Sequence, residues 1–344
     1  MRLADRIAQC RTPFLVENAQ DGSVTHLKNA AAFAKDIGSC ATRYVLNDEL
    51  ARLCTALAYS KGARTLACAD LLHVPAERVW VEWAEAPWQA ELARYGFKRP
   101  VEATISGRRG VFIQSTPQGR CGLLRTFWAE GESELEVLSS SMEAYFDFDA
   151  REDEELDVFG PKSGMRVSDA AVGDADILRR CFRFRFEHSW QAYYDSARLT
   201  PSQITAISHH ALGTIAIDIP VLLAFFLLLA TRPGLPRRPL MLERLNKARA
   251  RSGKAALLDH IEVLAPLLPE YRSAGSGGSE ASRRARRLHH VRGHLVRRGS
   301  TLFWRVPHLR GSARAGTLRT RTVTWQLEPS FSSTRIGEPS GALS

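Results

Sequence analysis

The spacing of apolar residues predicts helices in the first 60 residues. In "LKNAAAFAKDIG" and "LNDELARLCTALAYS" the apolar positions recur every three or four residues, which is the period of one face of an α-helix. Asn47 and Asp48 stand where the second pattern begins, and their side chains suit a helix N-terminus. We therefore expect the chain to begin with a mostly helical segment.

Between residues 78 and 150 the pattern changes to that of strands. The segment "RVWVEWAEAPW" is rich in β-branched and aromatic residues. The runs "VEATIS", "VFIQST", "CGLLRTFWAE" and "ELEVLSSSMEAYFDF" follow, separated by the turn-rich "GRRG", "PQGR" and "EGES". This spacing predicts an antiparallel meander, so residues 1–158 are expected to form an N-terminal α+β domain. An acidic run at 147–157 suggests a solvated loop at its end.

Helical periodicity returns afterwards, and residues 159–270 are expected to be a helical region. Its most apolar stretch, "ALGTIAIDIPVLLAFFLLLAT", is long enough to cross a bilayer as a single helix. However, Asp218 and Pro220 predict a helix start within it. The uninterrupted helix at 220–231 is then about 18 Å long, which is too short to span a bilayer. We therefore predict a buried core helix, with membrane association of residues 211–231 as the alternative that the sequence leaves open.

The next segment, "PLMLERLNKARARSG", predicts an amphipathic helix that stops at Gly253. Its spacing places three basic residues on one side and three apolar residues on the side expected to face the core: Arg244, Lys247 and Arg251 against Leu242, Leu245 and Ala248. Two interpretations of the basic side stay open: a solvated face, or an extension of an anion-binding surface.

Composition adds a preference for anionic partners. The 344 residues carry a net charge of +10, and arginines far outnumber lysines. Genomic base composition accounts for part of that excess, but arginine also forms bidentate contacts with phosphate that lysine cannot form. The six cysteines are dispersed without a CxxC pair, which favours reduced buried thiols over a zinc site. Together with an N-terminus that lacks a signal-peptide pattern, this predicts a cytoplasmic protein.

The C-terminal part of the chain holds the strongest charge pattern. We expect a flexible linker at 271–282, a basic β module at 283–328 and an unstructured tail at 329–344. From Arg283 to Leu327 there are twelve arginines and no acidic residue. The apolar residues in "VRGHLV", "TLFWRV" and "TVTWQL" distinguish this segment from a charged tail and predict folded strands. "PHLRGSARAG" is expected to be the connection to the third strand.

A hairpin with its turn at Arg298 and Gly299 sorts the residues of the module into two faces. In this register Val296 faces Thr301, Leu295 faces Leu302, and Arg292 faces Arg305. The apolar face collects Val291, Gly293, Leu295, Leu302, Trp304 and Val306, and the other face collects Arg292, His294, Phe303 and Arg305.

Like charges in directly opposed positions destabilise a strand pair, so Arg292 and Arg305 suggest an external anion between them. Arginine beside an aromatic residue on an exposed sheet suits phosphate contacts and stacking on bases. Further phosphate contacts are expected from Arg310, Arg319 and Arg321. The alternative is that acidic residues elsewhere in the fold, such as the 147–157 run, neutralise this face.

Catalytic interpretations have less support in the sequence. No nucleotide-binding, hydrolase or zinc-protease motif occurs. The fragment Asp259-His260-Ile261 resembles the opening of HNH-type nuclease motifs, in which a histidine activates water beside a metal-bound phosphate, and it makes His260 the one catalytic candidate. The histidines of the basic module, including His294 and His308, lack acidic or cysteine neighbours, so no metal site and no cofactor are expected.

The pattern "LNKARARSGK…LLDHIEV" followed by "RRLHHVRGHLVRRG…FWRVPHLRGSARAGTLRTRTV" resembles one found in proteins of phages, prophages and plasmids. The resemblance covers roughly residues 240–325, and its "VRGH" and "PHLRG" elements are the most specific. It implies a mobile-element setting, where nucleic-acid handling is common, and it implies no catalytic residues.

These observations predict an α+β protein with an N-terminal helical and antiparallel-meander domain, a helical middle layer and a small basic antiparallel module. The leading functional hypothesis is a non-catalytic nucleic-acid-binding protein of a mobile element. The alternatives are an assembly or host-interaction protein that acts through protein contacts, including self-association, and an HNH-like metal-dependent nuclease.

Overall fold

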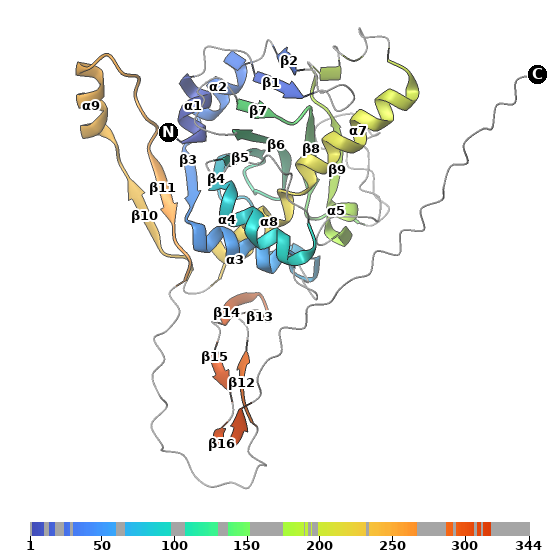
Figure 1. Ribbon diagram of the computed structural model, residues 1–344, viewed down its shortest axis with the longest axis vertical. Coiled ribbons are helices and arrows are strands. Elements are labelled where there is room, and N and C mark those ends of the chain that lie inside the picture. The colour runs from blue at the N-terminus through green and yellow to red at the C-terminus, as the bar shows by residue number, and fades with distance from the viewer. Residues whose placement is uncertain are drawn as a thin grey trace, which may run out of the picture. The chain divides into compact units, whose positions relative to one another are not determined.

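We analysed a computed structural model of the chain (Figure 1). The structure describes the following residues: 2–9, 14–17, 24–27, 30–59, 66–97, 107–129, 137–151, 175–231 apart from 189, 192–193 and 195–198, then 234–266, 287–291, 294–305, 308–310 and 312–317. Its contacts divide the chain into two units. Unit 1 is Met1–Tyr271 with His294–Val306, and unit 2 is Arg272–Gly293 with Pro307–Ser344.

Helices and strands are interspersed along unit 1. The helices are α1 (Leu3–Gln9), α2 (Ala30–Gly38), α3 (Asp48–Tyr59), η1 (Leu66–Leu71), α4 (Glu85–Leu92), η2 (Ala93–Tyr95), α5 (Ala175–Cys181), α7 (Pro201–Ala216), α8 (Ile219–Leu229) and α9 (Glu243–Arg251). The strands are β1 (Phe14–Glu17), β2 (Val24–Leu27), β3 (Thr42–Leu46), β4 (Arg78–Ala84), β5 (Arg108–Ser115), β6 (Cys121–Ala129), β7 (Val137–Ser139), β8 (Met142–Asp147), β9 (Phe182–Phe186), β10 (Arg237–Leu240), β11 (His260–Val263), β13 (His294–Arg298) and β14 (Thr301–Arg305).

One large mixed sheet organises unit 1. Its strand order is β10-β11-β3-β4-β5-β6-β7-β1-β2, with β8 paired to β6 and β9 paired to β8. The pairs β11–β3 and β3–β4 are parallel, whereas β4–β5 and β5–β6 are antiparallel. The antiparallel meander predicted for 100–150 is therefore present in β5, β6 and β8, and the fold is α+β as predicted. The segment "VEATIS" lies outside the described residues.

Alternating residues of the central strands supply two hydrophobic cores, one on each face of the sheet. Val79, Val81 and Trp83 of β4 belong to the core that includes α3 and α8. Between them, Trp80 belongs to the other core, with residues of α1 and α2 and with Phe112. A strand turns successive side chains to opposite faces, so one short aromatic-rich strand serves both cores. Figure 1 shows the helices gathered around this sheet.

Glu82 breaks the apolar pattern of β4 and anchors the first helix. Its carboxylate is fully buried and accepts hydrogen bonds from the backbone N–H groups of Leu3 (2.9 Å) and Ala4 (3.0 Å) at the start of α1, from the Trp80 indole and from Arg108. Burial opposes ionisation, but Arg108 and these N–H donors together lower the pKa of Glu82. A buried charge with this many partners positions α1 against the sheet.

The apolar stretch around residue 220 is a buried helix, as predicted. Every residue of α8 from Ile219 to Leu228 is buried. The combined segment Pro201–Leu229 has the length and composition of a membrane span, but 72% of its most apolar window is buried inside the protein. Asp218 precedes the helix without capping it, since its side chain makes no cap hydrogen bond and instead accepts one from Arg109.

Several strands lie where the periodicity predicted helices. β3 interrupts the helical N-terminal segment, β9 follows α5 directly, and β11 occupies "HIEV". All three are short, four or five residues long. β3 and β11 each lie between two strands of the sheet, where a strand reads as a brief apolar run rather than an alternating one, whereas β9 lies at the end of a branch and pairs with β8. Helical periodicity in the flanking residues concealed them. The Asn47 cap is confirmed: its Oδ1 accepts the N–H of Leu50 at 3.0 Å, and α3 begins at Asp48.

The predicted boundaries at the C-terminal end need one correction. We expected 283–328 to be a separate module, but His294–Val306 belongs to unit 1. The predicted linker at 271–282, the tail at 329–344 and most of the acidic run lie outside the described residues. Of the cysteines that the structure describes, Cys40, Cys54 and Cys181 are buried free thiols, and Cys68 and Cys121 are partly exposed free thiols.

Candidate nucleic-acid interface

β13 and β14 form the predicted hairpin, but its register differs from the prediction by two residues. Leu295 faces Trp304, Val296 faces Phe303, and His294 faces Arg305. The turn is at Gly299 and Ser300, with Gly299 in the left-handed region (φ 58°). Glycine takes this conformation without strain, and glycine followed by serine is a recognised two-residue hairpin turn. That signal was available in the sequence and favours this turn over one at Arg298 and Gly299.

The correction removes the predicted pairing of Arg292 with Arg305. Arg292 lies outside the described residues, and the position opposite Arg305 belongs to His294. Because the register moved by two residues, an even number, every described residue keeps its predicted face. The predicted pair of directly opposed arginines is therefore wrong, whereas the described residues keep the predicted apolar and basic faces.

The apolar face of the hairpin packs against the main core of unit 1. Leu302 is only 2% exposed and belongs to the core that contains α3 and α8, and Leu295 and Trp304 pack against the same core. We expected these residues to form the inside of a separate module. Instead they attach the hairpin to the large domain by burial of apolar surface.

Arg297, near the turn, fastens the hairpin to η1. Its Nη1 and Nη2 donate to the two carboxylate oxygens of Asp70 at 2.8 and 2.6 Å. This bidentate hydrogen bonding raises the pKa of Arg297. Asp70 is in turn positioned by Arg120, whose guanidinium donates to the carbonyls of Asp70 and Ala69 in η1 and of Leu72 just after it. Asp70 therefore neutralises Arg297, which lies on the apolar face of the hairpin and not on the face of Arg305. Most of the 147–157 run lies outside the described residues, so neutralisation of the Arg305 face by that run stays a prediction.

The other face of the hairpin points away from that core. We call it the outer face, and it consists of His294, Val296, Arg298, Thr301, Phe303 and Arg305. Arg298 and Arg305 are exposed, and His294 and Phe303 are partly exposed. The Arg298 guanidinium carbon lies 6.0 Å from the centre of the Phe303 ring. The outer face thus combines two exposed cations with an accessible aromatic ring.

Unit 2 contains a second small group of strands. These are β12 (Arg287–Val291), β15 (His308–Arg310) and β16 (Ser312–Thr317), with β12 paired antiparallel to β15 and parallel to β16. "PHLRGSARAG" therefore forms strands rather than the connection we predicted. Arg310 lies opposite His289 in the β12–β15 ladder. Arg319 and Arg321 lie outside the described residues.

Helix α9 carries the second predicted group of cations. Arg244, Lys247 and Arg251 are all exposed, and Lys247 pairs with Glu243 at 2.7 Å. The predicted inward side of this helix is wrong: Leu245 is 48% exposed and Ala248 is exposed. Figure 1 shows α9 at the outer end of the β10–β11 pair. A helix in that position has no sheet to pack against.

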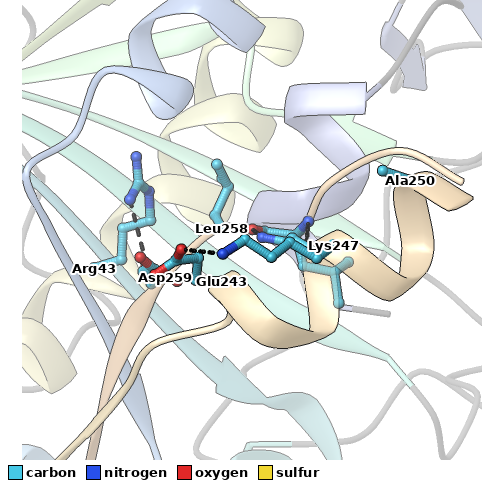
Figure 2. Close-up of a pocket in the computed structure, with 8 residues that line it drawn as sticks. Arg43, Glu243, Lys247, Ala250, Leu258 and Asp259 are labelled. Atoms are coloured by element: carbon cyan, nitrogen blue, oxygen red, sulfur yellow. Dashed lines mark hydrogen bonds and ion pairs between the residues drawn. The ribbon is translucent and has the colours of Figure 1, made fainter.

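A surface cleft of about 540 Å³ separates α9 from the chain that returns to β11. Figure 2 shows Arg43 beside Asp259 and the Glu243–Lys247 ion pair along the helix. Arg43 donates to three backbone carbonyls, including that of Asp259, and Asn246 exchanges two hydrogen bonds of 2.8 Å with the backbone of Leu257. The polar groups of the cleft thus serve mainly to hold α9 and its return segment.

His260, the catalytic candidate, is a buried residue of β11. It is 7% exposed, its Nδ1 lies 3.1 Å from the Leu258 carbonyl oxygen, and its Nε2 is buried without a hydrogen-bond partner. Burial lowers its pKa. Within the part of the chain that the structure describes, no group of three or more potential metal ligands occurs. The geometry gives His260 a place in the packing beside α1.

A buried ion cluster at the start of α8 was not predicted. Arg109 donates to Asp218 at 2.9 Å, lies 3.5 Å from Glu85 and has its guanidinium carbon 4.4 Å from the centre of the Trp88 ring. Burial raises the pKa of Asp218 to about 6, against the attraction of Arg109. Only the apparent helix-start signal of Asp218 was visible in the sequence, because its partner is more than a hundred residues away.

Comparison of the chain with protein-family models, with curated proteins and with solved structures gave no match.

Proposed function

We propose that this protein binds nucleic acid without catalysing a reaction on it, as a cytoplasmic protein of a phage or another mobile element. One observation carries the proposal: the outer face of the β13–β14 hairpin keeps Arg298 and Arg305 exposed on either side of Phe303. Exposed arginines bind the phosphate backbone, and an aromatic ring between them suits stacking on a base.

The way the hairpin is attached supports this proposal. Its apolar face is buried in the core, and its inward arginine is engaged by Asp70, so both of these serve anchoring. Within the part of the chain that the structure describes, neither Arg298 nor Arg305 makes an ion pair with an acidic residue. Both lie on a hairpin that is anchored through its opposite face, which lowers the entropic cost of binding an anion.

Helix α9 carries further exposed basic side chains that can contact phosphate. Arg244, Lys247 and Arg251 are exposed along it, and the chain as a whole carries a net charge of +10. Such a charge favours a polyanion over a neutral partner and accelerates its association.

The test is a salt titration of binding with the full chain, using labelled duplex DNA, single-stranded DNA and RNA. The logarithm of the binding constant should fall steeply and linearly with the logarithm of the salt concentration. In Arg298→Ala/Arg305→Ala the slope on duplex DNA should decrease by about two, since each phosphate contact contributes about 0.9.

The matched control removes two exposed arginines elsewhere. Arg52 on α3 and Arg94 on η2 are exposed, so Arg52→Ala/Arg94→Ala changes the net charge equally without touching the hairpin. Its slope should remain close to that of the unmodified chain. If none of the three nucleic acids binds at low salt, the proposed function is wrong.

A further inference from the structure

Helix α9 has no buried residue, and yet hydrogen bonds attach it to the segment that returns to β11. An isolated helix of nine residues is marginal in water, so something other than its own propensity must stabilise it. The Leu242 N–H donates to Asp259 Oδ1 at 2.6 Å, and Asn246 binds the Leu257 backbone in both directions. These contacts fix the inward side of the helix and leave its outward side uncovered.

The return segment of α9 is itself tied to the first helix of the fold. The Leu258 N–H donates to Asp5 Oδ1 at 2.7 Å, and the Gln9 side chain donates to the Ala256 carbonyl at 2.7 Å. Gly253, with φ at 68°, ends the helix and turns the chain back. The orientation of α9 is therefore set by hydrogen bonds to the domain rather than by burial of its own side chains.

The outward side of α9 has a small residue at its centre and cations at both ends. Ala248 lies four residues after Arg244 and three before Arg251, so the three share one stripe of the helix. Leu245 lies beside this stripe and is 48% exposed, and Met241, just before the helix, is 74% exposed. Two of the three large exposed apolar side chains among the described residues therefore lie on this helix or just before it.

From this arrangement we infer that α9 reads the sequence of duplex DNA from within the major groove. A helix about 10–12 Å in diameter fits a major groove about 12 Å wide. Alanine at the centre of the stripe lets the helix backbone approach the base edges. Arg244 and Arg251 are about 10.5 Å apart along the axis, which corresponds to about three base-pair steps.

The side chains of the stripe match what the major groove offers. The forked guanidinium groups of Arg244 and Arg251 can each bind the two acceptors of a guanine, the commonest sequence-specific contact. Leu245 supplies apolar surface of the kind that contacts the methyl group of thymine. Charge decides between DNA and a protein partner: from Glu243 to Lys254 the chain has five basic residues and one acidic residue.

This inference rests on the proposed function and adds sequence specificity to it. The experiment is a selection with the full chain from a library of duplexes with a randomised core, followed by affinity measurements on the enriched and a scrambled duplex. The enriched duplex should bind at least about tenfold more tightly, the discrimination that one bidentate arginine–guanine contact provides.

Two variants distinguish sequence-specific base contacts from nonspecific attraction by positive charge. Arg244→Lys/Arg251→Lys keeps both charges but loses the forked guanidinium groups, so the preference should fall by about tenfold or more while the salt slope stays the same. Ala248→Gln keeps a good helix former at an exposed position but blocks close approach of the whole helix, so it should abolish the preference. Ala32→Gln, at an exposed alanine of α2, is the matched control and should retain the preference.

The outcomes distinguish this inference from the proposed function. Salt-dependent binding without any enriched duplex overturns the role of α9 and leaves the proposed function standing. Binding to single strands alone, or a protein partner that survives nuclease treatment and is lost in Ala248→Gln, also overturns it. If no nucleic acid binds at low salt, both proposals fail together.

Discussion

Helices α8 and α9 have similar lengths and opposite environments. α8 has eleven residues, and all those from Ile219 to Leu228 are buried. α9 has nine residues, and none is buried. Burial of apolar side chains holds the first helix in place, whereas hydrogen bonds from its inward side hold the second.

The difference shows how exposure helps to locate function in this chain. A helix that packs into a core has its residues selected for shape and volume, so its composition says little about partners. The residues on the outward side of α9 are free of that constraint. Their basic and apolar character is therefore informative about what the helix contacts.

The sharpest test of this contrast makes the same substitution in both helices. Leu228 is 0% exposed and Leu245 is 48% exposed. Leu228→Ala should lower the free energy of unfolding by about 2–5 kcal/mol because it leaves a cavity. Leu245→Ala should change it by less than about 0.5 kcal/mol. Denaturant unfolding curves would measure both, and equal shifts would contradict the contrast.

The charged start of α8 gives a pH-dependent test. The pKa of Asp218 is about 6 in the folded state, above its ordinary value of 3.8, so the unfolded chain loses this proton at the lower pH. As the pH rises from about 4 to about 6, the free energy of unfolding should therefore fall by up to about 3 kcal/mol, because the unfolded chain releases this proton before the folded chain does. Asp218→Asn should flatten this part of the pH–stability curve, with the buried Arg109 still present.

An exposed apolar residue of α9 provides the control. Leu245 is 48% exposed, and Leu245→Ala should leave the steepness of the same pH–stability curve unchanged. If Asp218→Asn leaves the curve as steep as before, the buried ion cluster is not the source of this pH dependence.

The polar attachment of α9 can be weakened at one side chain. Asn246→Ala removes the two hydrogen bonds to the Leu257 backbone, so the free energy of opening the α9 amides should fall by about 1–2 kcal/mol. Amide hydrogen exchange should detect faster exchange in α9 and no change in α8. Asn246→Asp keeps an acceptor oxygen and should give a smaller effect; accelerated exchange throughout α8 would contradict a local attachment.

The smallest effect is expected from the ion pair on the surface of α9. Glu243 precedes Lys247 by four residues, the favourable order, and the two groups are 2.7 Å apart. Glu243→Gln should weaken the helix by about 0.2–0.5 kcal/mol at low salt. At high salt the difference should vanish because these exposed charges are screened. A difference that persists in high salt would point to a role other than ion pairing.

Much of the hairpin followed from its sequence. Alternation of apolar and polar residues placed Leu295, Leu302 and Trp304 on one face and Phe303 and Arg305 on the other, and the structure has the same faces. The register was predicted less well, since it depends on which two residues make the turn. A register shift of two residues keeps each side chain on its predicted face but changes every pair of opposed residues. For this reason the proposed anion contact involves Arg298 instead of Arg292.

Local patterns determined those features that depend on neighbours along the chain. They include the Asn47 cap, the buried helix around 220, the stop at Gly253 and the two faces of the hairpin. Helix and strand periods are properties of the backbone, so a sequence displays them directly.

Only the tertiary structure decided which surfaces remain free. Asp70 engages Arg297 across more than 220 residues, Arg109 meets Asp218 across more than a hundred, and α9 lies where no sheet covers it. No periodicity encodes such pairings, because they arise from how distant elements pack. The apolar positions of α9 looked like a core face for the same reason: amphipathic spacing predicts that a helix has two sides, but packing decides which of them is buried.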